Sequence, residues 1–166
     1  MKIIAYSFLA LLLFAAPAQA LVQPGAQVPE LSLPDTNQDN NSIAELAKGK
    51  VTLVVYWSLT CPHCHQYMPH FLFLNKRLAG NNFIMLFINS DGLSMAKAVA
   101  KYAEEHKMPG PWLIDEGEND SMPLAQLFDI YATPSVFLFD TNGKLIDAQE
   151  SDIDLDLIME KIQQSF

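Results

Sequence analysis

Two cysteines separated by two residues are the strongest candidates for chemistry in this chain. Cys61 and Cys64 lie in the sequence Cys-Pro-His-Cys, just after a β-branched, apolar run that ends at Trp57. A helical pattern begins at Cys61, so the pair falls at a strand-to-helix junction. The unpaired amides and the dipole of a helix N-terminus stabilise a thiolate there. We therefore predict that Cys61 is the nucleophile of thiol–disulfide exchange and that Cys64, one turn later, resolves the mixed disulfide.

The two residues between the cysteines are expected to tune the pair. Pro62 stiffens the first turn, has no amide hydrogen and is also expected to contact the substrate. His63 can donate to the Cys61 sulfur or, when charged, stabilise its anion, and both effects make the disulfide more oxidising. A disulfide this short in sequence constrains the unfolded chain little, so a purely structural role explains the pair poorly. We expect a redox-active disulfide, with no other cofactor and no metal.

Other uses of the same residues remain as alternatives. The letters C-P-H-C-H match the attachment motif of c-type haem, with His65 as axial ligand, but that motif needs a haem-sized apolar pocket. Zinc or copper would have to be held by four donors within five residues, which cannot easily surround one ion. A metal or haem chaperone and a redox-inactive adaptor are therefore the competing hypotheses.

The first twenty residues have the pattern of an export signal. Lys2 precedes an apolar run at 3–16, and small residues stand at Ala18 and Ala20. This pattern predicts a cleaved signal peptide at 1–20, a single domain at 21–166 and a periplasmic or secreted location. The alternative is an uncleaved anchor, although the run is short for a bilayer span. In an oxidising compartment, the two cysteines are expected to undergo thiol chemistry.

Composition restricts the class of protein further. The chain has 166 residues and a formal charge of −9, and half of its residues are hydrophobic. These values fit one folded domain and argue against disorder. The acidity argues against nucleic-acid binding, which needs a basic face, and against docking on anionic lipid. We expect a monomer with no membrane anchor after cleavage.

Hydrophobic patterning predicts alternating strands and helices. The apolar runs at 51–57 and 83–89 are typical of strands buried on both faces of a sheet. Further elements are expected as follows: a short helix after Ser42, a helix at 61–78 kinked at Pro69, a helix from Ser94 to His106, a strand at 112–114, a solvated acidic loop at 115–120, a short helix at 121–128, a β-hairpin at 135–148 and a helix from Asp152. This order implies an α/β domain with one mixed sheet and helices on both faces.

Several motifs in order resemble the thioredoxin fold. Trp57 stands four residues before Cys61, Pro69 stands five after Cys64, and Thr133-Pro134 opens a predicted strand. The segments VPELSLPD, YWSLTCPHCHQYMP, FINSD, WLID and TPSVFLFDTNGKLI resemble the TlpA-like secreted branch of that fold. The resemblance extends over nearly all of 28–162. It implies a secreted thiol–disulfide oxidoreductase that acts on protein thiols and exchanges electrons with a membrane partner.

The same resemblance implies roles for residues outside the cysteine pair. Pro134 would be a cis proline lying against the cysteines, and the backbone at Thr133 would bind an extended substrate by strand addition. Trp57 and Pro69 would be structural residues near the site. Between Cys64 and Pro134 lie 69 residues, enough for roughly two βα units. That is one unit more than plain thioredoxin has.

Two departures leave the direction of electron flow open. Val55 occupies the position where thioredoxins have a buried acid that assists proton transfer, so that role is unassigned. The Cys-Pro-His-Cys motif resembles DsbA-type oxidants, whereas the surrounding scaffold resembles TlpA-like reductants. The protein would therefore be either an oxidant of exported proteins or a reductant of apocytochrome c or copper-site cysteines.

Overall fold

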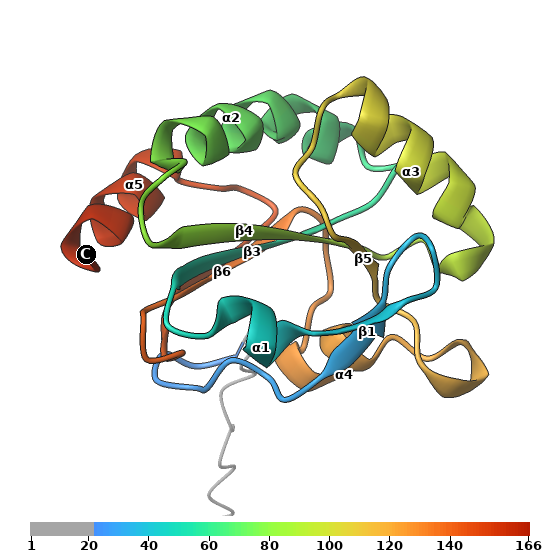
Figure 1. The fold of residues 1–166 in the computed structure, drawn as a ribbon, viewed down its shortest axis with the longest axis horizontal. Coiled ribbons are helices and arrows are strands. Elements are labelled where there is room, and N and C mark those ends of the chain that lie inside the picture. The colour runs from blue at the N-terminus through green and yellow to red at the C-terminus, as the bar shows by residue number, and fades with distance from the viewer. Residues whose placement is uncertain (1–21) are drawn as a thin grey trace, which may run out of the picture.

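A mixed β-sheet forms the centre of the molecule (Figure 1). The computed structural model describes residues 22–166, so the predicted signal peptide and its cut after Ala20 lie outside the described residues. The strand order is β5-β4-β3-β6-β7, with β3–β4 and β4–β5 parallel and with β3–β6 and β6–β7 antiparallel. The strands are β3 (Val51–Trp57), β4 (Phe83–Asn89), β5 (Trp112–Ile114), β6 (Ser135–Phe139) and β7 (Leu145–Glu150).

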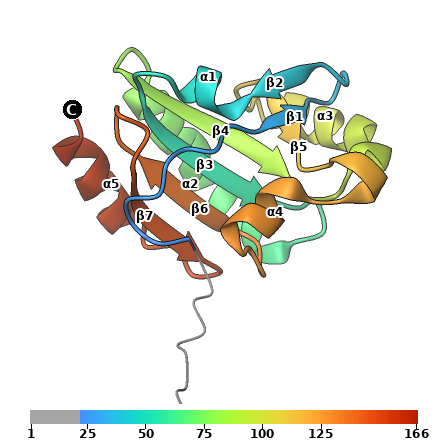
Figure 2. The same cartoon turned by 90° about the horizontal axis from the view of Figure 1, so that it is seen from below.

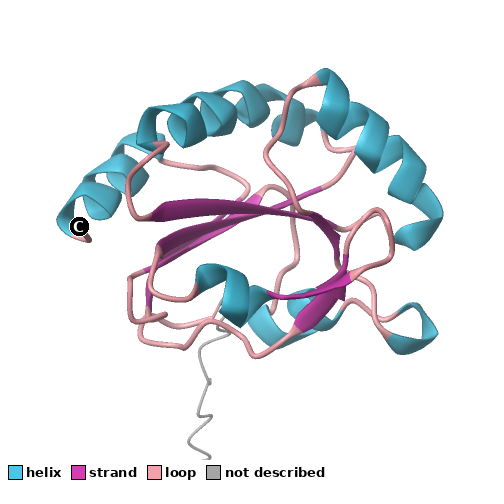
Figure 3. Ribbon diagram, viewed as in Figure 1, coloured by secondary structure: helices cyan, strands magenta, loops and turns pink. Residues whose placement is uncertain are grey.

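Helices cover both faces of this sheet, as the order of predicted elements implied. One face carries α2 (Pro62–Leu78), α3 (Ala96–Glu105) and α5 (Leu155–Gln164), and the other carries α1 (Ile43–Ala47) and α4 (Pro123–Phe128) (Figure 1). A small hairpin of β1 (Ser32–Pro34) and β2 (Asn40–Ser42) lies on the side of α1 (Figure 2). Coloured by element type, the sheet is enclosed between two helical layers (Figure 3).

The burial of the central strand β3 explains why its sequence is almost entirely apolar. All seven of its residues are buried. Successive side chains point to opposite faces, so Val55 and Trp57 join the core beneath α2, α3 and α5, whereas Val54 and Tyr56 join the core on the side of α1 and α4. The cysteines follow the carboxyl end of this doubly packed strand, which gives the site a rigid base.

Two of the predicted helix starts are wrong. Ser94 does not cap α3, because it lies within a 3₁₀ turn at Leu93–Met95 that precedes the helix. The last helix begins at Leu155 and is capped by Asp154, which accepts from the Leu157 amide at 2.9 Å. Asp152 instead accepts a hydrogen bond from the Tyr67 hydroxyl at 3.1 Å. At α5 two aspartates two residues apart could each cap the helix, whereas α3 begins after a 3₁₀ turn without any side-chain cap.

Two βα units separate the cysteine helix from β6. They are β4 with α3 and β5 with α4, in agreement with the predicted extra unit. The last of them brings α4 to the carboxyl edge of the sheet, next to the segment that leads into β6. In the part of the chain that the structure describes, no helix is long and apolar enough to cross a membrane.

Candidate active site

The cysteine pair is joined as a disulfide at the start of α2. Cys61 is the N-cap of this helix, and its Sγ accepts a hydrogen bond from the Cys64 amide at 3.0 Å. The Cα atoms of the pair are 5.3 Å apart. Cys61 is partly exposed, whereas Cys64 is only 1% exposed. The amide that holds the Cys61 sulfur would stabilise a thiolate there, and only that sulfur is presented to an incoming partner.

The segment before β6 lies directly against Cys61. The Thr133–Pro134 peptide bond is cis, and the Thr133 carbonyl oxygen lies 3.2 Å from Cys61 Sγ. In the disulfide that sulfur carries no proton, but a Cys61 thiol would find this carbonyl within donating distance. Glu150 on β7 holds the segment in place, because its Oε1 accepts from the amides of Tyr131 at 2.7 Å and Ala132 at 2.6 Å.

A carboxylate fixes the loop that leads into Cys61. Asp91, two residues after β4, accepts from the Leu59 amide at 2.7 Å and from the Ser58 hydroxyl at 2.6 Å. Asn89 donates to the same carboxylate at 2.9 Å. Charge-assisted bonds of this length are the strong ones in proteins. Residues at and just after the end of β4 therefore fix the loop that positions Cys61 at the start of α2.

His65 holds the same loop from the other side. The sequence suggested an ordinary, partly exposed helical residue, yet both ring nitrogens have partners. Nε2 lies 2.8 Å from the Leu59 carbonyl oxygen, and Nδ1 lies 3.1 Å from the Tyr102 hydroxyl on α3. Tyr102 in turn packs against Trp57, with ring centroids 5.2 Å apart. His65 thus links the start of α2 to α3, a contact between distant segments that spacing along one helix does not reveal.

Asp115 corrects the expectation of a solvated loop at 115–120. Its carboxylate is 1% exposed and accepts from the Tyr56 hydroxyl at 2.9 Å, from the Leu124 amide at 2.8 Å and from the Ala125 amide at 3.0 Å. It therefore caps α4, whose own N-cap residue supplies no side-chain bond. Burial raises the pKa of Asp115, while these hydrogen bonds oppose the shift. Burial and the neighbouring Asp115 also raise the pKa of Tyr56.

The remaining predicted site residues lie in and around the first half of α2. Pro62 and His63 are exposed in its first turn, and within the described part of the chain the His63 side chain has no hydrogen-bond or ion-pair partner. Pro69 lies inside the helix, and Trp57 is buried beneath it. Val55 is fully buried among apolar side chains, so the position that holds an acid in thioredoxins stays apolar here.

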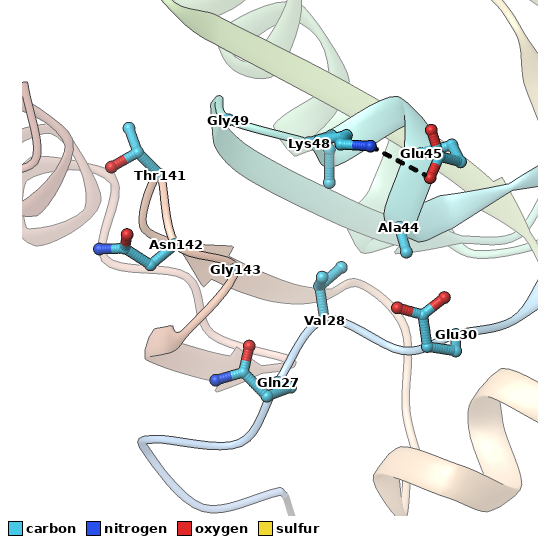
Figure 4. A pocket seen from close by; sticks show the side chains of 11 residues that line it. Gln27, Val28, Glu30, Ala44, Glu45, Lys48, Gly49, Thr141, Asn142 and Gly143 are labelled. Atoms are coloured by element: carbon cyan, nitrogen blue, oxygen red, sulfur yellow. Dashed lines mark ion pairs between the residues drawn. The ribbon is translucent and has the colours of Figure 1, made fainter.

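A hollow of about 550 Å³ lies far from the cysteines. It is at the amino end of β3, between the N-terminal segment, α1 and the turn before β7, and the exposed Glu45–Lys48 ion pair lines it (Figure 4). Cys61 follows the opposite end of that strand. Among residues 22–166, no group of three or more His, Cys, Asp or Glu side chains is arranged to hold a metal ion.

A cysteine pair that starts a helix and faces a cis-proline segment places this fold among the thioredoxin-like thiol–disulfide oxidoreductases. The family model of the redoxins matches residues 23–157. The chain belongs to the redoxin family.

Individual relatives agree with this assignment. Thioredoxin-like protein YneN of Bacillus subtilis is 27% identical over 127 residues, which cover 76% of this chain and 71% of YneN. A thioredoxin domain of a thiol-disulfide oxidoreductase from Bacteroides vulgatus superposes with a TM-score of 0.71 at 22% identity, over 84% of this chain and 97% of that one. A thioredoxin-family thiol:disulfide interchange protein from Chlorobium tepidum gives 0.70 at 17% identity, over 87% and 97%. These two structures confirm the thioredoxin-like fold.

Proposed function

We propose that the protein is an exported enzyme that exchanges electrons with the cysteines of other exported polypeptides. The observation that carries the proposal is the setting of Cys61, whose sulfur is held by the Cys64 amide at 3.0 Å and lies 3.2 Å from the Thr133 carbonyl. The sulfur is accessible and its anion is stabilised, and a segment suited to strand pairing lies beside it. The pattern at 1–20 supports export.

The reaction is a reversible exchange of two electrons. In the reducing direction, the Cys61 thiolate attacks one sulfur of a substrate disulfide, and the other substrate sulfur leaves as a thiolate. The Cys64 thiolate then attacks Cys61 Sγ, which forms the Cys61–Cys64 disulfide and releases the second substrate thiol. In the oxidising direction a substrate thiolate attacks Cys61 and the same steps run backwards. Either direction needs a second redox partner to restore the pair, and we propose one in the membrane.

The backbone beside the proline supplies the proposed substrate contact. Within the described residues, the Thr133 amide donates to no other group, and Thr133 is partly exposed. An extended polypeptide lying along this segment would satisfy that donor by strand addition. Its cysteine would then lie over Cys61, which the Thr133 carbonyl already contacts.

The test uses two variants, Cys61→Ser and Cys64→Ser, and a measurement of the reduction potential of the Cys61–Cys64 pair. With dithiothreitol as reductant, the protein is expected to accelerate insulin reduction, and Cys61→Ser is expected to remove the acceleration. Cys64→Ser should instead accumulate a mixed disulfide with the substrate, which mass spectrometry detects. Absence of exchange in the unaltered protein would refute the proposal. Equilibration with glutathione then sets the direction: a potential near about −120 mV identifies a disulfide donor, and one near about −270 mV a reductant.

A further inference from the structure

Leu59 lies two residues before Cys61 and is held by hydrogen bonds at both of its backbone polar groups. Its amide donates to the Asp91 carboxylate at 2.7 Å, and its carbonyl oxygen lies 2.8 Å from Nε2 of His65. Because a carbonyl oxygen can only accept, Nε2 of His65 carries the hydrogen of this bond. The segment that leads into the nucleophile is therefore fixed by one side chain from beyond β4 and by another from α2.

The second ring nitrogen of His65 sets the orientation of the imidazole. Nδ1 lies 3.1 Å from the Tyr102 hydroxyl on α3. With Nε2 protonated, Nδ1 of a neutral imidazole accepts from this hydroxyl, whereas in an imidazolium Nδ1 donates to it. Tyr102 is itself packed between two rings, with centroid distances of 5.2 Å to Trp57 and 4.0 Å to His106. The bond from His65 to Leu59 therefore suits either protonation state of the imidazole.

The position of Cys61 depends on this bond more in one redox state than in the other. In the oxidised protein the disulfide to Cys64 ties Cys61 to the helix covalently. In the reduced protein that tie is absent. Cys61 Sγ then stays at the Cys64 amide, which lies 3.0 Å from it in the oxidised protein, only if the preceding loop keeps Cys61 at the N-cap. Fixing Leu59 therefore stabilises the reduced pair more than the disulfide.

We propose that His65 is a positioning residue for thiol–disulfide exchange, which acts through Leu59 to keep the Cys61 thiolate at the helix N-terminus once the disulfide has opened. The proposal rests on the proposed function, because it concerns the same cysteine pair. The helix N-terminus stabilises a thiolate, and stabilising the reduced form makes the disulfide a stronger oxidant. A residue that stabilised both redox states equally would leave the reduction potential unchanged.

The test measures the equilibrium of the full chain with glutathione. One molecule of oxidised glutathione converts the reduced pair to the Cys61–Cys64 disulfide and yields two molecules of reduced glutathione, so the equilibrium constant compares the two redox states directly. His65→Ala removes the bond to Leu59 and should raise this constant about fivefold. Because a tenfold change corresponds to about 30 mV, the potential should fall by about 20 mV. The thiolate absorbance of the reduced variant should also appear at a higher pH.

Two further variants assign the effect to the hydrogen bond. His65→Gln places an amide nitrogen at the ε position, where it can donate to the Leu59 carbonyl, and should bring the constant within twofold of the unaltered protein. Tyr102→Phe keeps the aromatic ring but removes the hydroxyl that orients His65, and should raise the constant about twofold. The matched control is His70→Ala, because His70 is exposed on the same helix and its side chain has no hydrogen bond within the described residues. It should leave the constant unchanged.

The outcomes separate this proposal from the proposed function. If His65→Ala has the same equilibrium constant as the unaltered protein, His65 does not position the thiolate and the proposal is overturned. If His65→Gln shifts the constant as far as His65→Ala does, the bond to Leu59 is not the cause, and the proposal is overturned as well. An equal shift in His70→Ala would also contradict it, because that variant leaves Leu59 untouched. If the unaltered pair reacts with no disulfide, including oxidised glutathione, the proposed function itself fails.

Discussion

Replacement of Asp115 by alanine tests whether its buried carboxylate stabilises the contact between β3 and α4. The side chain accepts from the Tyr56 hydroxyl and from two amides in the first turn of α4. Asp115→Ala leaves the buried Leu124 amide without an acceptor and leaves Tyr56 Oη with only the weak thioether acceptor of Met122, at 3.8 Å. Water can reach the Ala125 amide, which is only partly buried.

The expected loss of stability follows from these contacts. A buried donor left without an adequate acceptor costs about 1–3 kcal/mol, so these two donors together cost about 4 kcal/mol. Part of this is offset, because burial of the Asp115 carboxylate is itself unfavourable, as its raised pKa indicates. We therefore expect Asp115→Ala to lower the free energy of unfolding by about 3 kcal/mol. With a urea slope of about 2 kcal/mol/M, the midpoint should fall by about 1.5 M.

Urea unfolding followed by circular dichroism measures this shift, with Glu118→Ala as the control. Glu118 is an exposed acid three residues later in the same loop, and its removal should change stability by less than about 0.5 kcal/mol. If the two variants were equally stable, the hydrogen bonds of Asp115 would contribute nothing, and the sequence-based view of a solvated loop would be correct.

The pH dependence of the free energy of unfolding provides a second test of the role of Asp115. The folded-state pKa of Asp115 is raised above its ordinary value of 3.8. Its contribution to stability is therefore complete below that value and is lost as pH rises through the folded-state pKa. Asp115→Asn removes this titration, so the difference in stability between the unaltered protein and the variant should shift in favour of the variant from pH 4 towards neutrality. A difference independent of pH would contradict the raised pKa.

Three further predictions concern groups in and around the site. The pKa of Tyr56 is raised by burial and by Asp115, so its contribution to stability is complete below pH 10 and falls progressively as pH rises above it. In alkaline urea titrations the difference in stability between the unaltered protein and Tyr56→Phe should therefore shift in favour of the variant, and a difference independent of pH would contradict the raised pKa. His63→Pro should lower the reduction potential in glutathione buffers by roughly 20–60 mV, about 1–3 kcal/mol, and an unchanged potential would exclude His63 as the tuning residue. Glu150→Ala frees the amides of Tyr131 and Ala132 and should speed their hydrogen exchange at least tenfold, while insulin reduction falls severalfold. Equal exchange in both proteins would show that Glu150 does not order that segment.

The elements closest to the chemistry were predictable because their signals are local. The apolar run at 51–57, the cysteine at a helix start and the β-hairpin at 135–148 each depend on a few neighbouring residues, and each is confirmed. The motif order also indicated the cis bond before Pro134, which the structure contains.

The contacts that position the site were not predictable in the same way. Asp115 lies in a run of acids that is typical of a solvated loop, and only its tertiary contact with Tyr56 distinguishes it from the exposed Glu118. Likewise, the Asp91 bond to the Leu59 amide joins residues 32 positions apart, and the His65 bond to Tyr102 spans 37. Such pairs depend on strand order and helix packing, which no spacing within a single element encodes.

The unequal burial of the two cysteines has a consequence for how the protein resists damage. Peroxide reacts with accessible thiolates and converts them stepwise to sulfenic, sulfinic and sulfonic acids, the last of which is irreversible. Cys61 is the sulfur that such an oxidant can reach, whereas Cys64 is enclosed by the core. A sulfenic acid at Cys61 would have the Cys64 thiol one turn away, and their condensation releases water and restores the ordinary disulfide. The shielded cysteine thus protects its partner from permanent loss, as well as completing each turnover.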